Sequence, residues 1–327
     1  MPMRRRAALA APCLALLPLA GQRAAGAQSF PERPVRYIVP FAPAGLTDIM
    51  ARLVAQRLGE AWNRPVVVEN RAGGNAMIGA EAAAKSPPDG HTLLAITLTH
   101  AVNVSLFPNA PYDLMRDFVP VSVLGSLPLV VVVPAAAPYR TLADFLAAAR
   151  TRNMNGGSSG NGSPPHLGLE LVRRAAGAGA NITHVSYRGG APAVTDLVAG
   201  NLDFIVSNLP ECLSQLQAGR LRGLAITSAQ RHRLVPDIPT VSEAGQPSLA
   251  MTNWTAMLTN SAVPRHVLAE ISRATQAALR DAETRRRAEE GGFDVLAWDT
   301  DRSLAFIAEE VARWGRVVRE AQIRPDA

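Results

Sequence analysis

Apolar residues in this chain alternate between short β-branched runs and stretches in which they recur every three or four positions. The first such unit runs from Tyr37 to Leu58 and predicts a buried strand over 37–39, a Pro/Gly loop and an amphipathic helix. Thr47 and Asp48 stand where N-cap side chains are favoured. Because the first N–H groups of a helix carry partial positive charge, such a joint is a candidate anion site.

The same alternation continues along the chain and favours an α/β fold with mostly parallel sheets flanked by helices. Strands are predicted at 64–70, 91–97, 119–134, 182–186, within 201–210, after Gly219 and at 251–260. Helices are predicted at 77–85, 141–153, 167–176, 191–200, 267–281 and about 300–322, and loops at 99–108 and 156–166.

A chain of 327 residues is long for one core, so two lobes are expected. The β-branched run ending at Pro134 is the longest and suits a strand that crosses between lobes. The expected organisation is a signal peptide over 1–27, lobe one over 28–126, lobe two over 127–250, and a return to lobe one over 251–327.

The first 27 residues have the pattern of a cleavable secretory signal, with Arg4, Arg5 and Arg6 before a short apolar stretch and an A-x-A site ending at Ala27. Removing them takes four arginines from 33 basic residues, leaving 29 against 27 acidic ones, a net charge of +2. Nucleic acid is therefore not an expected partner. The mature chain is expected in the periplasm, with Cys212 as its one cysteine and no disulfide.

Motifs for chemistry are weak. The six histidines lack metal-ligand spacing, and no phosphate or dinucleotide motif is present, so neither metal nor cofactor is expected. Gly156-Gly157-Ser158-Ser159-Gly160 formally matches G-x-S-x-G. The glycines weaken a preceding strand and the following loop delays the helix, so a secreted serine hydrolase is only a remote alternative.

Three joints share one pattern, in which a probable strand meets the start of a probable helix through small residues: 44–48, 158–166 and 187–191. The first lies in the expected lobe one and the other two in lobe two. Ligands of open α/β sheets bind at the carboxyl ends of the strands. A small anion held between the lobes is therefore expected, although most joints of this kind bind nothing.

Beyond these patterns, the chain resembles the Bug family of periplasmic receptors for tripartite tricarboxylate transporters. The resemblance rests on PERPVRYIVPFAPAGLTDIMAR, VVVENRAGG, PPDGHTLL, PYDLMRDFVPVS, SSGNGSPPH, HVSYRGGAPAVTDLVAG, LQAGRLRGLAITSAQR, VPDIPTVSEAG and VARWGRVV. It implies a two-lobed, type II-like Venus flytrap that closes on a small organic carboxylate, without catalysis. It also implies delivery to membrane transporter subunits by a monomeric receptor; a sensor kinase ectodomain is the alternative partner.

The resemblance also implies ligand-binding residues. On lobe one these are Phe41, Ala44, Gly45, Asp48, Thr99 and Asn103. On lobe two they are Ser158, Ser159, Gly160, Asn161, Ser163, His166, Tyr187, Gly189 and Ser207. Three residues have an alternative to ligand contact. Ser163 could serve only as a helix cap, His166 could support its own loop, and Arg188 could be a surface group.

Two positions depart from the family pattern. Ala44 stands where a glycine is usual, and its methyl group restricts positive φ and narrows the approach to the loop amides. Ser207 stands where an acid is frequent, which favours a plain carboxylate or an aromatic acid over an amino acid as ligand.

Overall fold

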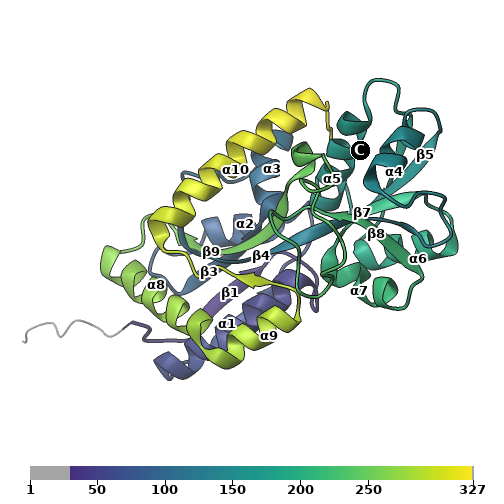
Figure 1. Ribbon diagram of the computed structural model, residues 1–327. Helices are drawn as coiled ribbons and strands as arrows, with labels where there is room; N and C mark the ends of the chain where they lie inside the picture. Colours follow the sequence, from purple (N-terminus) through teal and green to yellow (C-terminus); the bar gives the residue numbers. More distant parts are fainter. Residues whose placement is uncertain (1–29, 326–327) are drawn as a thin grey trace, which may run out of the picture.

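Two groups of parallel strands are joined into one curled sheet by two long strands that run through the middle of the molecule (Figure 1). The computed structural model describes residues 30–325. The strand order is β2-β1-β3-β9-β4-β7-β5-β6, with β10 and β8 also paired to β4. The first group (β2, β1, β3) belongs to lobe one and the second (β7, β5, β6) to lobe two, with helices packed on both (Figure 1).

The elements alternate along the chain as the hydrophobic pattern predicts. The strands are β1 Val35–Val39, β2 Val66–Asn70, β3 Thr92–Thr97, β4 Phe118–Pro134, β5 Met154–Ser158, β6 Ile182–Ser186, β7 Phe204–Asn208, β8 Leu221–Ile226, β9 Thr252–Asn260 and β10 Asp294–Val295. The α-helices are α1 Leu46–Trp62, α2 Met77–Ala84, α3 Leu98–Leu106, α4 Leu142–Ala149, α5 Pro164–Ala176, α6 Gly190–Ala199, α7 Leu209–Gln217, α8 Arg265–Arg280, α9 Ala282–Glu290 and α10 Thr300–Glu320. A short 3-10 helix spans Pro247–Leu249.

The strand β4 belongs to both lobes. Its residues from Phe118 to Pro128 pair antiparallel with β9, and those from Leu129 onward pair antiparallel with β7 and β8. The chain returns through Met251, whose N–H donates to the Thr227 carbonyl 3.1 Å away, and continues into β9. The expected two-lobed α/β receptor fold is confirmed; parallel pairing holds within each outer group, while the pairs of the joining strands are antiparallel.

Three local predictions were wrong. The segment 99–108, predicted as a loop, lies largely in α3, because Thr97 and His100 form a capping box at its start. The predicted loop 156–166 begins with the end of β5, whose small residues leave room for Leu169 and Phe204 against Gly156. The N-cap of α1 is Gly45 rather than Thr47 or Asp48.

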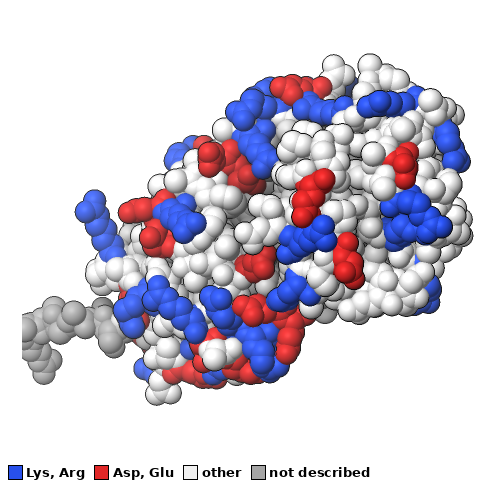
Figure 2. All heavy atoms as spheres, in the orientation of Figure 1, with Lys and Arg blue, Asp and Glu red and all other residues white. Residues whose placement is uncertain are grey.

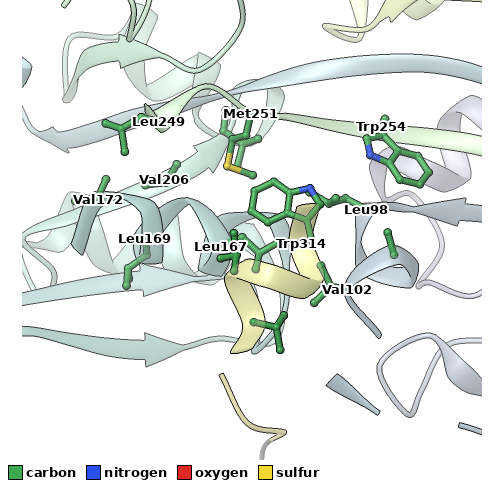
Figure 3. Packing of buried hydrophobic residues seen from close by; sticks show 14 of the residues in the cluster. Leu98, Val102, Leu167, Leu169, Val172, Val206, Leu249, Met251, Trp254 and Trp314 are labelled. Atoms are coloured by element: carbon green, nitrogen blue, oxygen red, sulfur yellow. The ribbon is translucent and has the colours of Figure 1, made fainter. Parts of the chain in front are cut away.

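One hydrophobic cluster extends from lobe one into lobe two beneath α10. It contains Leu98 and Val102 of α3, Leu167 of α5 and the fully buried Trp314 of α10 (Figure 3). The indole N–H of Trp314 donates to Glu310 Oε2 at 3.0 Å. Long-range packing at this point therefore ties the C-terminal helix to both lobes.

Acidic and basic side chains are interspersed over the face drawn in Figure 2. Within residues 30–325, none of the helices combines the length and apolarity needed to cross a membrane. The predicted signal peptide over 1–27 lies outside the described residues.

The buried His100 generates a prediction about pH. It is fully buried, its Nδ1 accepts from the Thr97 N–H at 3.2 Å, and burial lowers its pKa to about 3. The unfolded chain takes up this proton near pH 6.5, so between that pH and about 3 stability falls as pH falls. We expect this one group to cost roughly 2 kcal/mol of unfolding free energy on going from pH 7 to pH 5.

The measurement is urea unfolding of the wild type and His100→Gln at both pH values. Glutamine keeps an acceptor for the capping box but does not titrate. The variant should lose less stability than the wild type on acidification. Parallel pH profiles for the two proteins would contradict the prediction.

Candidate functional site

A cavity of about 900 Å³ lies between the two groups of parallel strands. Its walls come from the segments that follow the carboxyl ends of β1, β2 and β3 in lobe one and of β5, β6 and β7 in lobe two. This is where open α/β sheets place their ligands. Asn253, near the start of the joining strand β9, and Pro325, at the end of the described chain, complete the wall.

The β1–α1 joint forms one wall through Phe41, Gly45 and Thr47. Asp48 lies behind it, and its carboxylate accepts from the Ala44 N–H at 2.9 Å, Arg52 Nε at 2.8 Å and Asn70 Nδ2 at 2.8 Å. Burial opposes ionisation of Asp48, yet these three hydrogen bonds lower its pKa below the ordinary value. Asp48 therefore fixes the loop, and α1 begins at Gly45 without a side-chain cap.

The β2–α2 joint, residues 72–77, is a second wall of lobe one that the sequence analysis did not select. Gly73, Gly74, Asn75 and Ala76 follow one another with φ of 123°, 52°, 51° and 70°. This turn leads into the start of α2, which has no side-chain cap, and the first N–H groups of a helix suit an anion. Asn103 holds this loop from behind: its Nδ2 donates to the Asn75 carbonyl at 2.7 Å and its Oδ1 accepts from Asn75 Nδ2 at 2.8 Å.

The β5–α5 joint is the main loop of lobe two. Ser158 is buried at its base, with Oγ 2.6 Å from His184 Nε2 and accepting from the Gly160 N–H at 3.2 Å. Ser163 both caps α5 and lines the cavity. His166 Nδ1 accepts from the Gly162 N–H at 3.0 Å, and its ring stacks on His184 at 3.9 Å between centroids.

The β6–α6 joint lies beside the β5–α5 joint, and the Tyr187 N–H donates to the Ser158 carbonyl at 3.0 Å. Tyr187 lines the cavity and donates its hydroxyl to Asp196 Oδ2 at 2.7 Å; burial and this acidic neighbour raise its pKa to about 12. Gly189 and Gly190 bring the start of α6 up to the cavity. Arg188 is exposed and also lines the cavity, so it is a surface group at the edge of the site.

The structure divides the predicted site residues into two layers. The cavity wall contains Phe41, Gly45, Thr99, Ser159, Gly160, Asn161, Ser163, Tyr187 and Gly189. The buried layer behind it contains Asp48, Asn103, Ser158, His166 and Ser207, while Ala44 is an exposed loop residue outside the wall. Residues in this second layer orient the loops; they do not line the cavity.

Ala44 lies outside the cavity wall. It adopts a φ of 63° despite its methyl group, and its N–H is already bound to Asp48. It is therefore not a free amide that the methyl group shields from a ligand.

The geometry of Ser158 does not favour nucleophilic catalysis. The expected weak strand was wrong, because β5 runs directly into Ser158. However, the side chain is 1% exposed, it lies outside the cavity wall, and α5 begins only at Pro164. A nucleophile elbow needs an exposed serine between strand and helix. The other nucleophile, Cys212, is buried, which raises its pKa to about 12.

The wall residues that sequence reasoning missed are mainly the 72–77 loop, Asn208, Glu211 and Asn253. The first carries the same signal as the three selected joints, a strand followed by glycines and a helix. Asn208 and Glu211 gave no such signal, because β7 passes into α7 with no loop between them. Within residues 30–325, no three or more His, Cys, Asp or Glu side chains are grouped to hold a metal.

Asp48 provides a test of this two-layer arrangement. Asp48→Asn introduces an N–H donor among the groups that donate to it, so we expect a loss of about 1–3 kcal/mol of unfolding free energy. The control is Asp237→Asn, the same change at an exposed position, expected to stay within about 0.5 kcal/mol. Chemical denaturation measures both; equal effects of the two variants would contradict the role of Asp48.

Comparison with known proteins agrees with this geometry. The family model described as "Tripartite tricarboxylate transporter family receptor" matches residues 50–323. Protein BugT of Bordetella pertussis is 38% identical over 299 residues, covering 90% of this chain and 91% of BugT.

Two solved structures have the same fold over nearly their whole length. Rpa4515 of R. palustris, solved with adipate, superposes with a TM-score of 0.82 at 33% identity, covering 91% of this chain and 100% of that chain. MatC from Rhodopseudomonas palustris, solved with bound malate, gives 0.78 at 30% identity, with 88% and 100% covered. The resemblance to Bug proteins is thus confirmed, and the chain belongs to the tripartite tricarboxylate transporter receptor family.

Proposed function

We propose that this protein is a periplasmic receptor that captures a small organic carboxylate between its lobes and delivers it to a tripartite tricarboxylate-type transporter. The observation that carries the proposal is the convergence of six strand-to-helix joints on one cavity. These joints supply backbone N–H groups and hydroxyls rather than a cluster of cationic side chains. Relatives solved with adipate and malate support a carboxylate as ligand.

The carboxylate has two candidate contacts on lobe one. One is the uncapped start of α1 at Gly45, Leu46 and Thr47; the other is the left-handed run 73–76. Both present N–H groups whose loops are already held by side chains behind the wall, Asp48 and Asn103. Little conformational entropy then remains to be lost on binding, which favours affinity.

Closure of the lobes completes the mechanism. A cavity of about 900 Å³ is at the upper end of small-molecule sites. Approach of the 159–163 and 187–190 loops toward lobe one would bury a short carboxylic acid. We propose that residues 28–126 with 251–327 and residues 127–250 move as the two bodies. A ligand touching both shifts the population toward the closed form.

The finer parts of the proposal are cleavage of the signal near Ala27, a monomeric receptor, no catalysis, and transport rather than signalling. A sensor kinase ectodomain reading the closed surface is the second candidate function. Deletion of the receptor separates the two: uptake of the ligand is lost if this receptor transports. An unchanged uptake with a lost transcriptional response would identify signalling.

The direct test is a thermal-shift screen of the purified mature protein against mono-, di- and tricarboxylic acids. A ligand at about 100 times its dissociation constant should stabilise the protein by about 2.7 kcal/mol. X-ray scattering with and without the best ligand should show compaction. A panel in which no acid shifts the melting temperature contradicts carboxylate capture; binding without compaction contradicts closure.

A matched pair of glycine variants tests the lobe-two loop. Gly160 (φ 130°) lines the cavity and Gly245 (φ 77°) does not. Alanine is strained at either φ, so each variant should lose on the order of 1–2 kcal/mol of stability. Only Gly160→Ala should weaken ligand binding, by about tenfold if one hydrogen bond to the carboxylate is lost. Calorimetry that finds the same affinity in both variants would count against contact with this loop.

A further inference from the structure

Two charged side chains stand out in a cavity otherwise lined by apolar, glycine and neutral polar residues. Among the described residues on the wall, Arg188 is the only cationic one and Glu211 the only acidic one. Arg188 is exposed, whereas Glu211 is partly buried. An acidic group inside a cavity for carboxylates needs a physical explanation, because it repels the proposed ligand.

Glu211 is held in a defined place by its neighbours. It lies in the first turn of α7, and its Oε2 accepts from Asn208 Nδ2 at 3.1 Å. Asn208 Oδ1 accepts in turn from Asn253 Nδ2 of β9 at 3.1 Å. A Cβ added at Gly190 would collide with the carboxylate, so Glu211 is packed against the first residue of α6.

The Glu211 carboxylate therefore lies at the N-terminal ends of both α6 and α7. The N-terminal ends of α6 and α7 favour negative charge, and Glu211 supplies it from within the chain. A ligand carboxylate would meet a like charge here. A ligand N–H or O–H group would instead meet an acceptor.

Glu211 lines the cavity and accepts a side-chain hydrogen bond from Asn208 Nδ2. Burial raises the pKa of Glu211, and the hydrogen bond from Asn208 only partly opposes that effect. A partly desolvated carboxylate gains from one more hydrogen-bond donor.

We infer that Glu211 makes the receptor selective for carboxylic acids that also carry an ammonium or hydroxyl donor. The inference rests on the proposed function and names the ligand class of the same cavity. It replaces the expectation drawn from Ser207, whose hydroxyl donates to the Asn208 carbonyl at 3.2 Å behind the wall. Many family members have an acidic side chain where this chain has Ser207, and we infer that Glu211, in the following first turn of α7, provides the acidic group instead.

The test uses dicarboxylic acids matched in length and differing only at C2. Three sets suffice: succinate, malate and aspartate; glutarate, 2-hydroxyglutarate and glutamate; adipate, 2-hydroxyadipate and 2-aminoadipate. Calorimetry on the wild type should show that, at the preferred length, a donor-bearing acid binds about tenfold or more tightly than the unsubstituted one. The member of the set that binds more tightly, hydroxyl or amino, identifies the hydrogen-bond donor that Glu211 prefers.

Variants of Glu211 assign the preference to this side chain. Glu211→Gln keeps an acceptor oxygen but removes the charge, so the advantage of an ammonium ligand should fall about tenfold or more, and that of a hydroxyl ligand less. Glu211→Ala should abolish both advantages. Glu283→Gln, which removes an equally negative but exposed side chain in α9, should leave every ratio unchanged.

The ratio of affinities separates selectivity from a merely structural role. If Glu211 only stabilised the starts of α6 and α7, its variants would weaken all acids alike, and the inference would be wrong. It would also be wrong if the wild type bound the unsubstituted acids as tightly as the substituted ones. If none of the nine acids binds while another carboxylic acid shifts the melting temperature in the screen, the inference about Glu211 is wrong and the proposed carboxylate receptor stands.

Discussion

The rest of the structure depends on one strand that is shared by both lobes. The hydrogen bonds of β4 pass from β9 to β7 and β8 at the step from Pro128 to Leu129. Proline has no N–H to donate, and the Leu129 N–H donates to Thr227 Oγ1 at 2.9 Å. A continuous strand fixes the direction of both strand groups, so their carboxyl ends face one cavity. The buried Trp314 adds a second tie, through the hydrophobic cluster that spans both lobes.

Three of the loops that wall the cavity are held by buried polar side chains behind them. Each of these side chains forms hydrogen bonds with backbone groups of its loop and so fixes the loop's conformation. Asp48 does this for the β1–α1 joint, Asn103 for the 72–77 loop, and Ser158 with His166 for the β5–α5 joint. Glu211 differs, because its own carboxylate occupies the place where two helices begin. The wall of lobe two therefore carries an acidic side chain beside the small and polar residues of its loops.

Sequence reasoning succeeded where the signal is local. Apolar periodicity predicted α1, and the predicted helices 141–153 and 267–281 contain α4 and most of α8. It failed over 99–108, where β-branched and polar residues have modest helix propensity. Leu98 and Val102 pack into the core shared with α10, and this tertiary contact outweighs propensity. The family was predicted from order and spacing of motifs, and with it nine of the residues that line the cavity.

The sequence by itself determined the alternation of strands and helices, the receptor family and the small-residue joints, because each is encoded in neighbouring residues. Only the tertiary structure decided which side of each joint faces the cavity. Ala44 and Gly45 are adjacent in sequence, yet Asp48 takes the N–H of Ala44, and Gly45 is left on the wall. Ser207 was expected at the ligand, yet it is buried behind the wall near the end of β7, whereas Glu211 in the first turn of α7 lines the cavity. Whether a polar group is free to bind depends on partners distant in sequence, and folding brings those partners together.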